Sequence, residues 1–270
     1  MTSKYATNRL HATEDTVNTS AVPVPRKTVL VTGGTRGIGR AIVTKLVNDG
    51  WNVGFTYRSE ASVADLFLET LRKGAADPQQ RIQAFAVDLA SDESVRGLPA
   101  QVEAHFGRLD ALVNNAGLTD DGAFLTMDAS RWQRVLNANF GGTARLTLAA
   151  LPALLRQSDP SVVVVASLAG ISGKEGQVSY ATSKGALVGF TQWLGRRYGE
   201  QGLRVNAIAP GFIRTEMVNV LEPEMYDHIL AATALKRMGE VEEVAAAVAF
   251  LLSPGYLQGS TLRIDGGFKR

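Results

Sequence analysis

Short, mainly apolar runs alternate along most of the chain with longer segments of helical periodicity. The first run, 28–31, leads into a glycine-rich turn, and segment 37–49 then carries apolar residues every three or four positions. Run 162–166 is almost purely β-branched, which is typical of a strand buried on both faces. The predicted strands are 28–31, 53–57, 81–87, 110–113, 162–166, 204–208 and 260–264. The predicted helices are 37–49, 63–72, 93–106, 130–155, 179–198 and 241–252.

This alternation of strands with long helices predicts the fold class. A strand followed by a helix of ten or more residues, repeated, is typical of a parallel sheet with helices on both faces. We therefore predict an α/β protein: a single-domain, Rossmann-type doubly wound parallel sheet of about seven strands. The domain is expected over 27–270, after a flexible N-terminal tail over 1–26. Segment 212–240 interrupts the rhythm and is expected to be a substrate lid.

Composition removes several classes of function. The chain has 270 residues, with 28 Lys+Arg against 26 Asp+Glu, so its net charge of +2 gives no reason to expect a nucleic-acid partner. It has no cysteine and only three histidines, so thiolate chemistry and a multi-histidine metal site are not expected. The longest apolar run, 244–252, is shorter than the roughly 18 residues that cross a membrane. We expect a cytoplasmic protein without a membrane partner.

The turn after the first strand reads Thr32-Gly33-Gly34-Thr35-Arg36-Gly37-Ile38-Gly39. Glycines allow a tight turn and let backbone N–H groups approach a pyrophosphate at a helix N-terminus. The spacing Gly-x-x-x-Gly-x-Gly differs from the Gly-x-Gly-x-x-Gly of the usual dinucleotide fingerprint, so a purely structural turn is the alternative.

The end of the second strand predicts which dinucleotide would bind. Enzymes that use NAD usually have a carboxylate there, which accepts from the ribose 2′-hydroxyl. Here the strand ends Tyr57-Arg58-Ser59, and Arg36 lies in the turn. Two guanidinium groups suit a 2′-phosphate, so we predict NADP(H), with Arg58 as a plain surface residue being the alternative.

Candidate acid–base chemistry lies on the helix over 179–198. Tyr180 and Lys184 are four residues apart and project from one face. An ammonium group near a tyrosine lowers the pKa of its hydroxyl, which can then exchange a proton with an alcohol or a carbonyl. Ser167 ends a buried strand, where a parallel sheet opens at its carboxyl edge, and could bind the same substrate oxygen.

Over about 27–268 the chain resembles the short-chain dehydrogenases/reductases, because several motifs occur in the family's order. These are Thr32-Gly33 with Gly37-Ile38-Gly39, Asp88-Leu89, Asn114-Asn115-Ala116-Gly117, Asn139, Ser167, Tyr180 with Lys184, Pro210-Gly211, Thr215, and Leu262 with Asp265-Gly266-Gly267.

The resemblance implies a role for each motif. Tyr180 would donate the proton in reduction, Lys184 would lower its pKa and bind the nicotinamide ribose, and Ser167 would polarise the carbonyl. Asn139 would hold a water that links Lys184 to solvent, a helix-kinking polar residue being the alternative. The residues implied to bind NADP(H) are Gly33, Thr35, Arg36, Gly37, Ile38, Gly39, Arg58, Asp88, Leu89, Asn115, Ala116, Gly117, Tyr180, Lys184, Pro210, Gly211, Ile213 and Thr215. No metal is implied.

Within the family the chain is most similar to 3-oxoacyl-[acyl-carrier-protein] reductases, which implies an acyl thioester on a carrier protein, in fatty acid or polyketide-type synthesis. Gln201 departs from this subgroup, which often has a basic residue there. Candidate basic residues near the cleft, which would steer an acidic carrier, are Arg196, Arg197, Lys236 and Arg237. A plain solvated charge is the alternative for each of them. The alternatives are an NADP-dependent alcohol, sugar or steroid dehydrogenase and a non-catalytic NADP(H)-binding regulator.

The resemblance also implies a homo-oligomer, a dimer or a tetramer. Relatives pair their two long helices across subunits, and these correspond to about 130–155 and 179–199 in this chain. Small residues on them, such as Ala144 and Gly189, would permit close approach. The alternative is that these small residues pack internally against the sheet.

Overall fold

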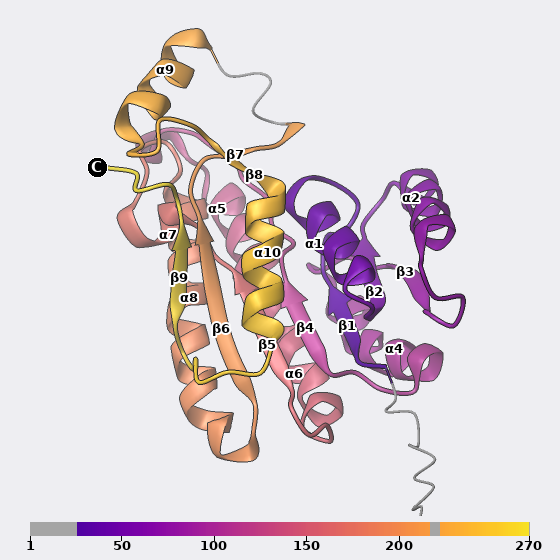
Figure 1. Cartoon of the computed structure of the whole chain (residues 1–270). Helices are drawn as coiled ribbons and strands as arrows, with labels where there is room; N and C mark the ends of the chain where they lie inside the picture. Colours follow the sequence, from indigo (N-terminus) through magenta and orange to yellow (C-terminus); the bar gives the residue numbers. More distant parts are fainter. Residues whose placement is uncertain (1–25, 217–221, 270) are drawn as a thin grey trace, which may run out of the picture.

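A parallel sheet of seven strands, in the order β3-β2-β1-β4-β5-β6-β9, forms the centre of the computed structural model, which describes residues 26–216 and 222–269 (Figure 1). The strand order reverses between β1 and β4, as in a doubly wound fold. The predicted single-domain, Rossmann-type α/β class is therefore confirmed. The strands are β1 (Thr28–Val31), β2 (Asn52–Tyr57), β3 (Ile82–Ala86), β4 (Ala111–Asn114), β5 (Ser161–Val165), β6 (Arg204–Pro210) and β9 (Thr261–Ile264).

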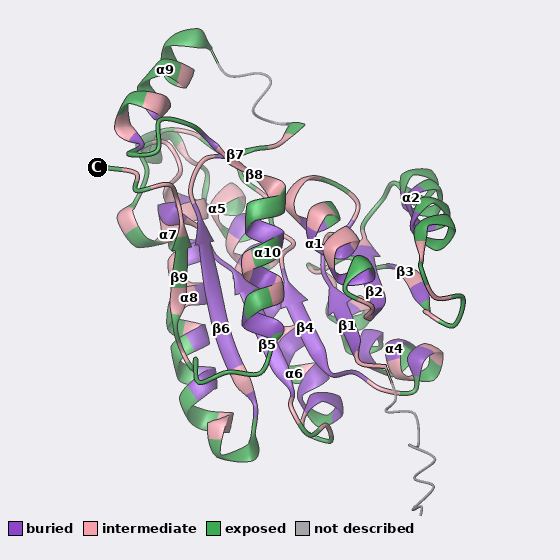
Figure 2. Ribbon diagram, viewed as in Figure 1, coloured by how far each residue is buried: buried purple, intermediate pink, exposed green. Residues whose placement is uncertain are grey.

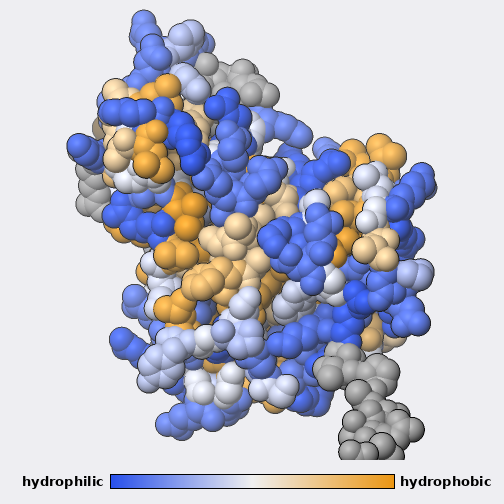
Figure 3. All heavy atoms as spheres, in the orientation of Figure 1, coloured by the Kyte–Doolittle hydropathy of each residue, from blue (hydrophilic) through white to orange (hydrophobic). Residues whose placement is uncertain are grey.

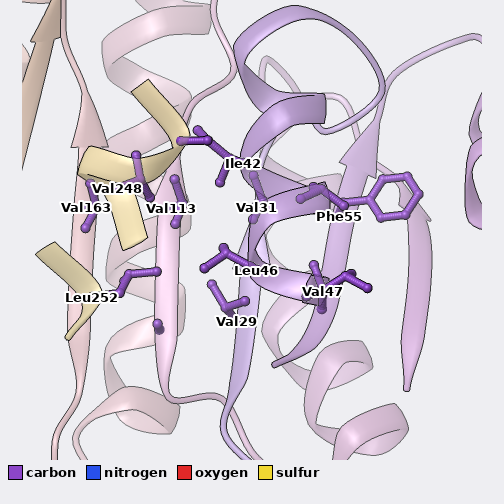
Figure 4. Packing of buried hydrophobic residues seen from close by; sticks show 14 of the residues in the cluster. Val29, Val31, Ile42, Leu46, Val47, Phe55, Val113, Val163, Val248 and Leu252 are labelled. Carbon is purple, nitrogen blue, oxygen red and sulfur yellow. The ribbon is translucent and has the colours of Figure 1, made fainter. Parts of the chain in front are cut away.

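Helices cover both faces of the sheet. Successive strand residues point to opposite sides, so one strand contributes apolar side chains to two hydrophobic cores. Val29 and Val31 belong to the core under α1 (Gly37–Asn48), α2 (Ala61–Gly74) and α10 (Val241–Leu252), part of which is drawn in Figure 4. Leu30, between them, belongs to the opposite core. That core lies under α4 (Leu98–Phe106), α6 (Gly142–Leu154) and α8 (Val178–Tyr198). The central strands are accordingly buried, and exposed residues lie mainly on the outer sides of the helices and on the loops (Figure 2).

Two helices predicted as continuous are interrupted. Segment 93–106 forms α3 (Asp92–Arg96) and α4, because Pro99 has no N–H to continue the hydrogen-bond ladder of α3. Segment 130–155 forms α5 (Ala129–Leu136), a π-helical turn η2 (Asn137–Gly141) and α6. Its Pro152, by contrast, is accommodated inside α6. π-turns of this kind often occur at functional sites.

The carboxyl edge of the sheet is covered by segments that periodicity did not predict. They are η1 (Phe124–Thr126), α7 (Leu168–Ser172), the strand pair β7 (Ile213–Arg214) and β8 (Gly239–Glu240), and α9 (Pro223–Ala232). Periodicity also did not predict η3 (Gly199–Gln201), which lies at the opposite, amino edge, between the end of α8 and the start of β6. In Figure 1, α9 projects beyond the carboxyl edge. The expected lid over 212–240 remains a prediction, and its residues 217–221 lie outside the described part, as do residues 1–25 of the expected tail.

The C-terminal segment fastens α9 to the rest of the fold. The backbone N–H of Lys269 donates to Ala232 O at 2.8 Å, and that of Leu235 donates to Gly266 O at 3.1 Å. Thr233 and Phe268 form an antiparallel bridge between these contacts. In the described part of the chain, no helix is both long and apolar enough to cross a membrane.

Candidate active site

The glycine-rich turn is fixed to the end of β4 through Thr32. The hydroxyl oxygen of Thr32 accepts from the backbone N–H groups of Asn115 and Ala116 at 2.9 and 3.0 Å. The side-chain amide of Asn115 in turn donates to the carbonyl oxygens of Thr32 and Gly33 at 2.9 and 3.1 Å. The two loops thus form one rigid unit at the point where the strand order reverses, which is where doubly wound sheets bind ligands.

Gly39 shows how closely the chain approaches itself in this turn. A Cβ atom at this position would lie 1.9 Å from the carbonyl oxygen of Gly33, a distance no side chain can occupy. The absence of a side chain lets the first turn of α1 press against the end of β1. The N-terminus of α1 then opens toward the groove, where its free N–H groups favour an anion.

A groove of about 430 Å³ runs from this turn across the ends of β2, β3 and β4. Most of the residues predicted to bind a dinucleotide line it. They are Gly33, Thr35, Arg36, Gly37, Ile38, Gly39, Arg58, Asp88, Leu89, Asn115, Ala116, Gly117 and Thr215. The sequence did not single out the other lining residues, which include Thr56, Glu60, Leu118, Ala138 and Glu216. A groove of this length and chemistry fits a dinucleotide.

Five predicted cofactor residues do not line the groove. Two of them, Tyr180 and Lys184, belong to the candidate acid–base group. Of the other three, Pro210 ends β6, Gly211 follows it, and Ile213 begins β7 and is buried. The N–H of Gly211 is used by Ile264 O at 2.9 Å. These three residues lead into Thr215, which does line the groove.

Tyr180, Ser167 and Lys184 come together at the carboxyl edge beside the groove. Tyr180 lies in the first turn of α8, where its hydroxyl is hydrogen-bonded to the side chain of Ser167, the N-cap of α7. The ammonium nitrogen of Lys184 lies 5.6 Å from the centre of the Tyr180 ring and donates to Val165 O at 2.7 Å. Two hydroxyls therefore face the same side, with a buried cation behind them.

The expected lowering of the tyrosine pKa is not what this arrangement gives. The pKa of Tyr180 is raised, chiefly by burial, while its hydrogen bond to Ser167 acts in the opposite direction and the negative charge of Asp121 adds to the rise. Burial also lowers the pKa of Lys184 to about 8. Desolvation is thus the largest cause of both shifts. At neutral pH the phenol retains its proton, which suits a proton donor.

Asn139 is fully buried in the π-turn and holds the β4 loop to α8. Its side-chain oxygen accepts from Leu118 N–H at 2.8 Å, and its amide nitrogen donates to Leu118 O and to the hydroxyl of Ser183 at 2.9 and 3.0 Å. Both amide hydrogens are therefore used. The side-chain oxygen accepts one hydrogen bond and can accept another, so the water between Lys184 and solvent stays a prediction.

Sequence reasoning missed Ser183, which receives this hydrogen bond and donates in turn to Tyr180 O at 2.7 Å. Its position three residues after Tyr180, on the same face of the helix, was the available signal. Asn114, included in the family motif, is buried behind the groove, where its amide nitrogen donates to Thr147.

The basic residues expected near the cleft are mostly elsewhere. Arg196 and Arg197 are in the last turn of α8, about 24 Å along the helix from Tyr180. Arg237 is paired with both carboxylate oxygens of Glu243 at 2.7 Å. Lys236 donates to Ala231 O at the end of α9. For the two α8 arginines the expectation was wrong, because a periodic pattern identifies a helix but not which end approaches the site.

Comparison with known proteins agrees with this geometry. Residues 33–269 match a family model described as enoyl-(acyl carrier protein) reductase. A 3-oxoacyl-[acyl-carrier-protein] reductase of Salmonella typhimurium is 37% identical over 245 residues, which cover 89% of this chain and 96% of that protein. The corresponding proteins of Staphylococcus epidermidis and Staphylococcus aureus are 35% and 34% identical, with 89% of this chain covered in each case and 98% and 97% of those proteins.

Proposed function

Because the chain belongs to the short-chain dehydrogenase/reductase family, a family of oxidoreductases that act on CH–OH and C=O groups, we propose that it reduces the 3-oxo group of an acyl thioester on an acyl carrier protein, in fatty acid or polyketide-type synthesis in the cytoplasm. The observation that carries the proposal is the meeting of the Tyr180 and Ser167 hydroxyls beside the dinucleotide groove. The activity for which these relatives are named supports this choice of substrate.

The residues divide the proposed reaction as follows. The hydroxyls of Ser167 and Tyr180 hold the carbonyl oxygen of the substrate, and the proton of Tyr180 passes to that oxygen as the carbonyl carbon is reduced. NADPH, when bound, supplies the hydride. Lys184 keeps a positive charge behind the tyrosine below a pH of about 8, and its hydrogens not used by Val165 O can bind the cofactor ribose.

We propose NADPH as the cofactor on the basis of two arginines. Arg36 and Arg58 line the groove and are exposed, and neither is paired with a carboxylate in the described part of the chain. Their guanidinium groups are therefore available to a 2′-phosphate. Glu60 lines the same part of the groove, and as a carboxylate it would favour an unphosphorylated ribose. Comparing the KM for NADPH with the KM for NADH decides between the effect of the two arginines and that of Glu60.

The proposed activity is tested by following NADPH oxidation with an acetoacetyl thioester, free and on a carrier protein, and then with panels of ketones, sugars and steroids. We expect the thioester to have the highest kcat/KM. A higher kcat/KM for an alcohol, sugar or steroid substrate would instead identify the chain as a dehydrogenase of that class. NADPH binding without turnover on any of them would favour a regulator.

We also propose that the protein assembles with copies of itself. Leu148 on α6 and Trp193 on α8 are 68% and 59% exposed, which is unusual for such large apolar side chains. Gly189, on α8, has no atom within 4 Å of where its Cβ would be, so it is not an internal packing position. A second apolar surface lies on α10, which carries the exposed Phe250 (Figure 3). Sedimentation at micromolar concentration tests the assembly, and a monomer there would contradict it.

A further inference from the structure

The loop after β4 is joined to the segment before Tyr180 by two hydrogen bonds on the outer side of the site. The amide nitrogen of Gln177 donates to the Asp121 carboxylate at 2.7 Å. Next to this contact, the backbone N–H of Gly122 donates to Gly176 O at 2.8 Å. Gln177 immediately precedes α8, so this contact reaches the helix turn that carries the tyrosine.

The same loop is joined to α8 on the inner side through Asn139, which connects Leu118 to Ser183. Between these two connections, Asp120 is held by Arg131 and Arg134 of α5. The loop after β4 is thus joined to α8 through Leu118 and to the segment before α8 through Asp121 and Gly122. Asp121 is therefore held in place by its own hydrogen bond and by the anchoring of its neighbour.

The charges around Tyr180 make Asp121 distinctive. Lys184 of α8 is the cation behind the ring, and the charge of Asp120 is compensated by its two arginines. The Asp121 carboxylate accepts from the neutral amide of Gln177, and within the described part of the chain it forms no ion pair. Arg131, which is paired with Asp120, also donates to the backbone oxygen of Asp121 at 3.0 Å. The other charged residues of the surrounding segments are Lys174, which lies over the Phe212 ring at 5.2 Å, and Glu175, both before α8, and Glu216 after β7.

We propose that Asp121 and Gln177 are a positioning pair for Tyr180, in which the hydrogen bond from Gln177 holds a carboxylate without an ion pair of its own beside the helix turn that carries the tyrosine. The carboxylate favours the protonated form of the tyrosine, the form that reduction consumes. It opposes the pull of Lys184 toward the phenolate, and the two charges together set the pH range over which the hydroxyl can donate. The pair acts through Tyr180 and has no direct contact with the reacting atoms. The role of the pair rests on the proposed reduction, but its effect on the titration of Tyr180 can be measured without that reaction.

Asp121→Asn separates charge from contact, because an asparagine oxygen can still accept from Gln177. We expect the tyrosinate absorbance of Tyr180, measured against Tyr180→Phe as baseline, to appear at a pH lower by about 0.5 unit, the size expected for an exposed charge in water. The alkaline limb of kcat/KM for reduction moves in the same direction. Asp65→Asn, on the exposed side of α2, removes the same charge far from the site and is the matched control.

Gln177→Ala tests the contact. It leaves the carboxylate in place but free to move, so we expect a smaller shift in the titration and a several-fold rise in KM. Both positions lie on partly exposed loops, and equal melting temperatures check that the variants are folded. A titration of Asp121→Asn that coincides with wild type, or moves to higher pH, overturns the electrostatic role. An unchanged KM in Gln177→Ala overturns the positioning role.

The absorbance titration needs no substrate. If no carbonyl compound is turned over, the proposed function fails while the titration still decides the effect of Asp121 on Tyr180. If turnover is found and the titration does not shift, the pair alone is refuted.

Discussion

Lys184 makes the enzyme less stable below the pH at which it loses its proton. Its side chain is 3% exposed, and burial lowers its pKa from 10.5 to about 8. A difference of roughly 2.5 pH units corresponds to about 3 kcal/mol of stability at full protonation. We predict that Lys184→Met, of similar length and without charge, unfolds at higher urea concentration than wild type at neutral pH.

The sign of the pH dependence follows from proton binding. Below a pH of about 8 the lysine is charged in both states, so the whole cost of burying it is present. Between about 8 and 10.5 the folded protein has released the proton and the unfolded chain has not, so wild-type stability rises with pH. Above 10.5 both states are neutral and the cost is gone.

Lys184→Met also loses the hydrogen bond to Val165 O, which costs about 1 kcal/mol at any pH. We therefore expect the variant to be more stable than wild type by about 2 kcal/mol near pH 7, and the advantage to shrink by about 2 kcal/mol near pH 10. Lys73→Met, at a side chain that is 80% exposed, is the control and should show no such change. A stability difference between Lys184→Met and wild type that stays constant across this range would refute the reasoning.

Three further predictions concern the site and its support. Tyr180→Phe should lower kcat by about 10²-fold or more while NADPH affinity by fluorescence titration changes little, and turnover within tenfold of wild type would contradict its role as proton donor. Arg58→Ala should raise the KM for NADPH by about 10-fold or more and leave that for NADH nearly unchanged, because only the former offers a 2′-phosphate; equal effects would count against the NADP assignment. Gly170→Ala should destabilise the protein by about 1–3 kcal/mol in urea, since its Cβ would lie 2.6 Å from the backbone nitrogen of Gly185, whereas Gly189→Ala on the open side of α8 should not. Equal effects of these two substitutions would show that α7 and α8 are not closely packed.

Local patterns predicted the parts of the fold that depend on local physics. Continuous apolar runs such as Val29, Leu30 and Val31 identified strands, because both faces of the sheet are covered and apolar. The glycine turn was recognisable because Gly39 can carry no side chain there. Most of the predicted dinucleotide residues lie along one groove, because they follow strand ends at the carboxyl edge of the sheet.

What the sequence could not predict depends on three-dimensional surroundings. The π-turn at Asn139 continues a helical pattern without changing its composition, and α7 is too short to show periodicity. The direction of the Tyr180 pKa shift was wrong because the pattern Tyr-x-x-x-Lys shows the cation but not the burial of both groups. The contact between Asp121 and Gln177 joins loops that are far apart along the chain, and neither residue belongs to a motif.

The attachment of α9 to the last residues of the chain has a practical consequence for handling the protein. Gly266, Phe268 and Lys269 form part of the wall behind α9, whereas the described chain begins at Arg26, next to Gly50 on the opposite, amino edge of the sheet. A purification tag or a surface linker added after the last residue would pull on the segment that holds α9. A linker attached at the amino edge, near Gly50, would leave that segment undisturbed. Immobilised protein should therefore be attached at the amino edge of the sheet.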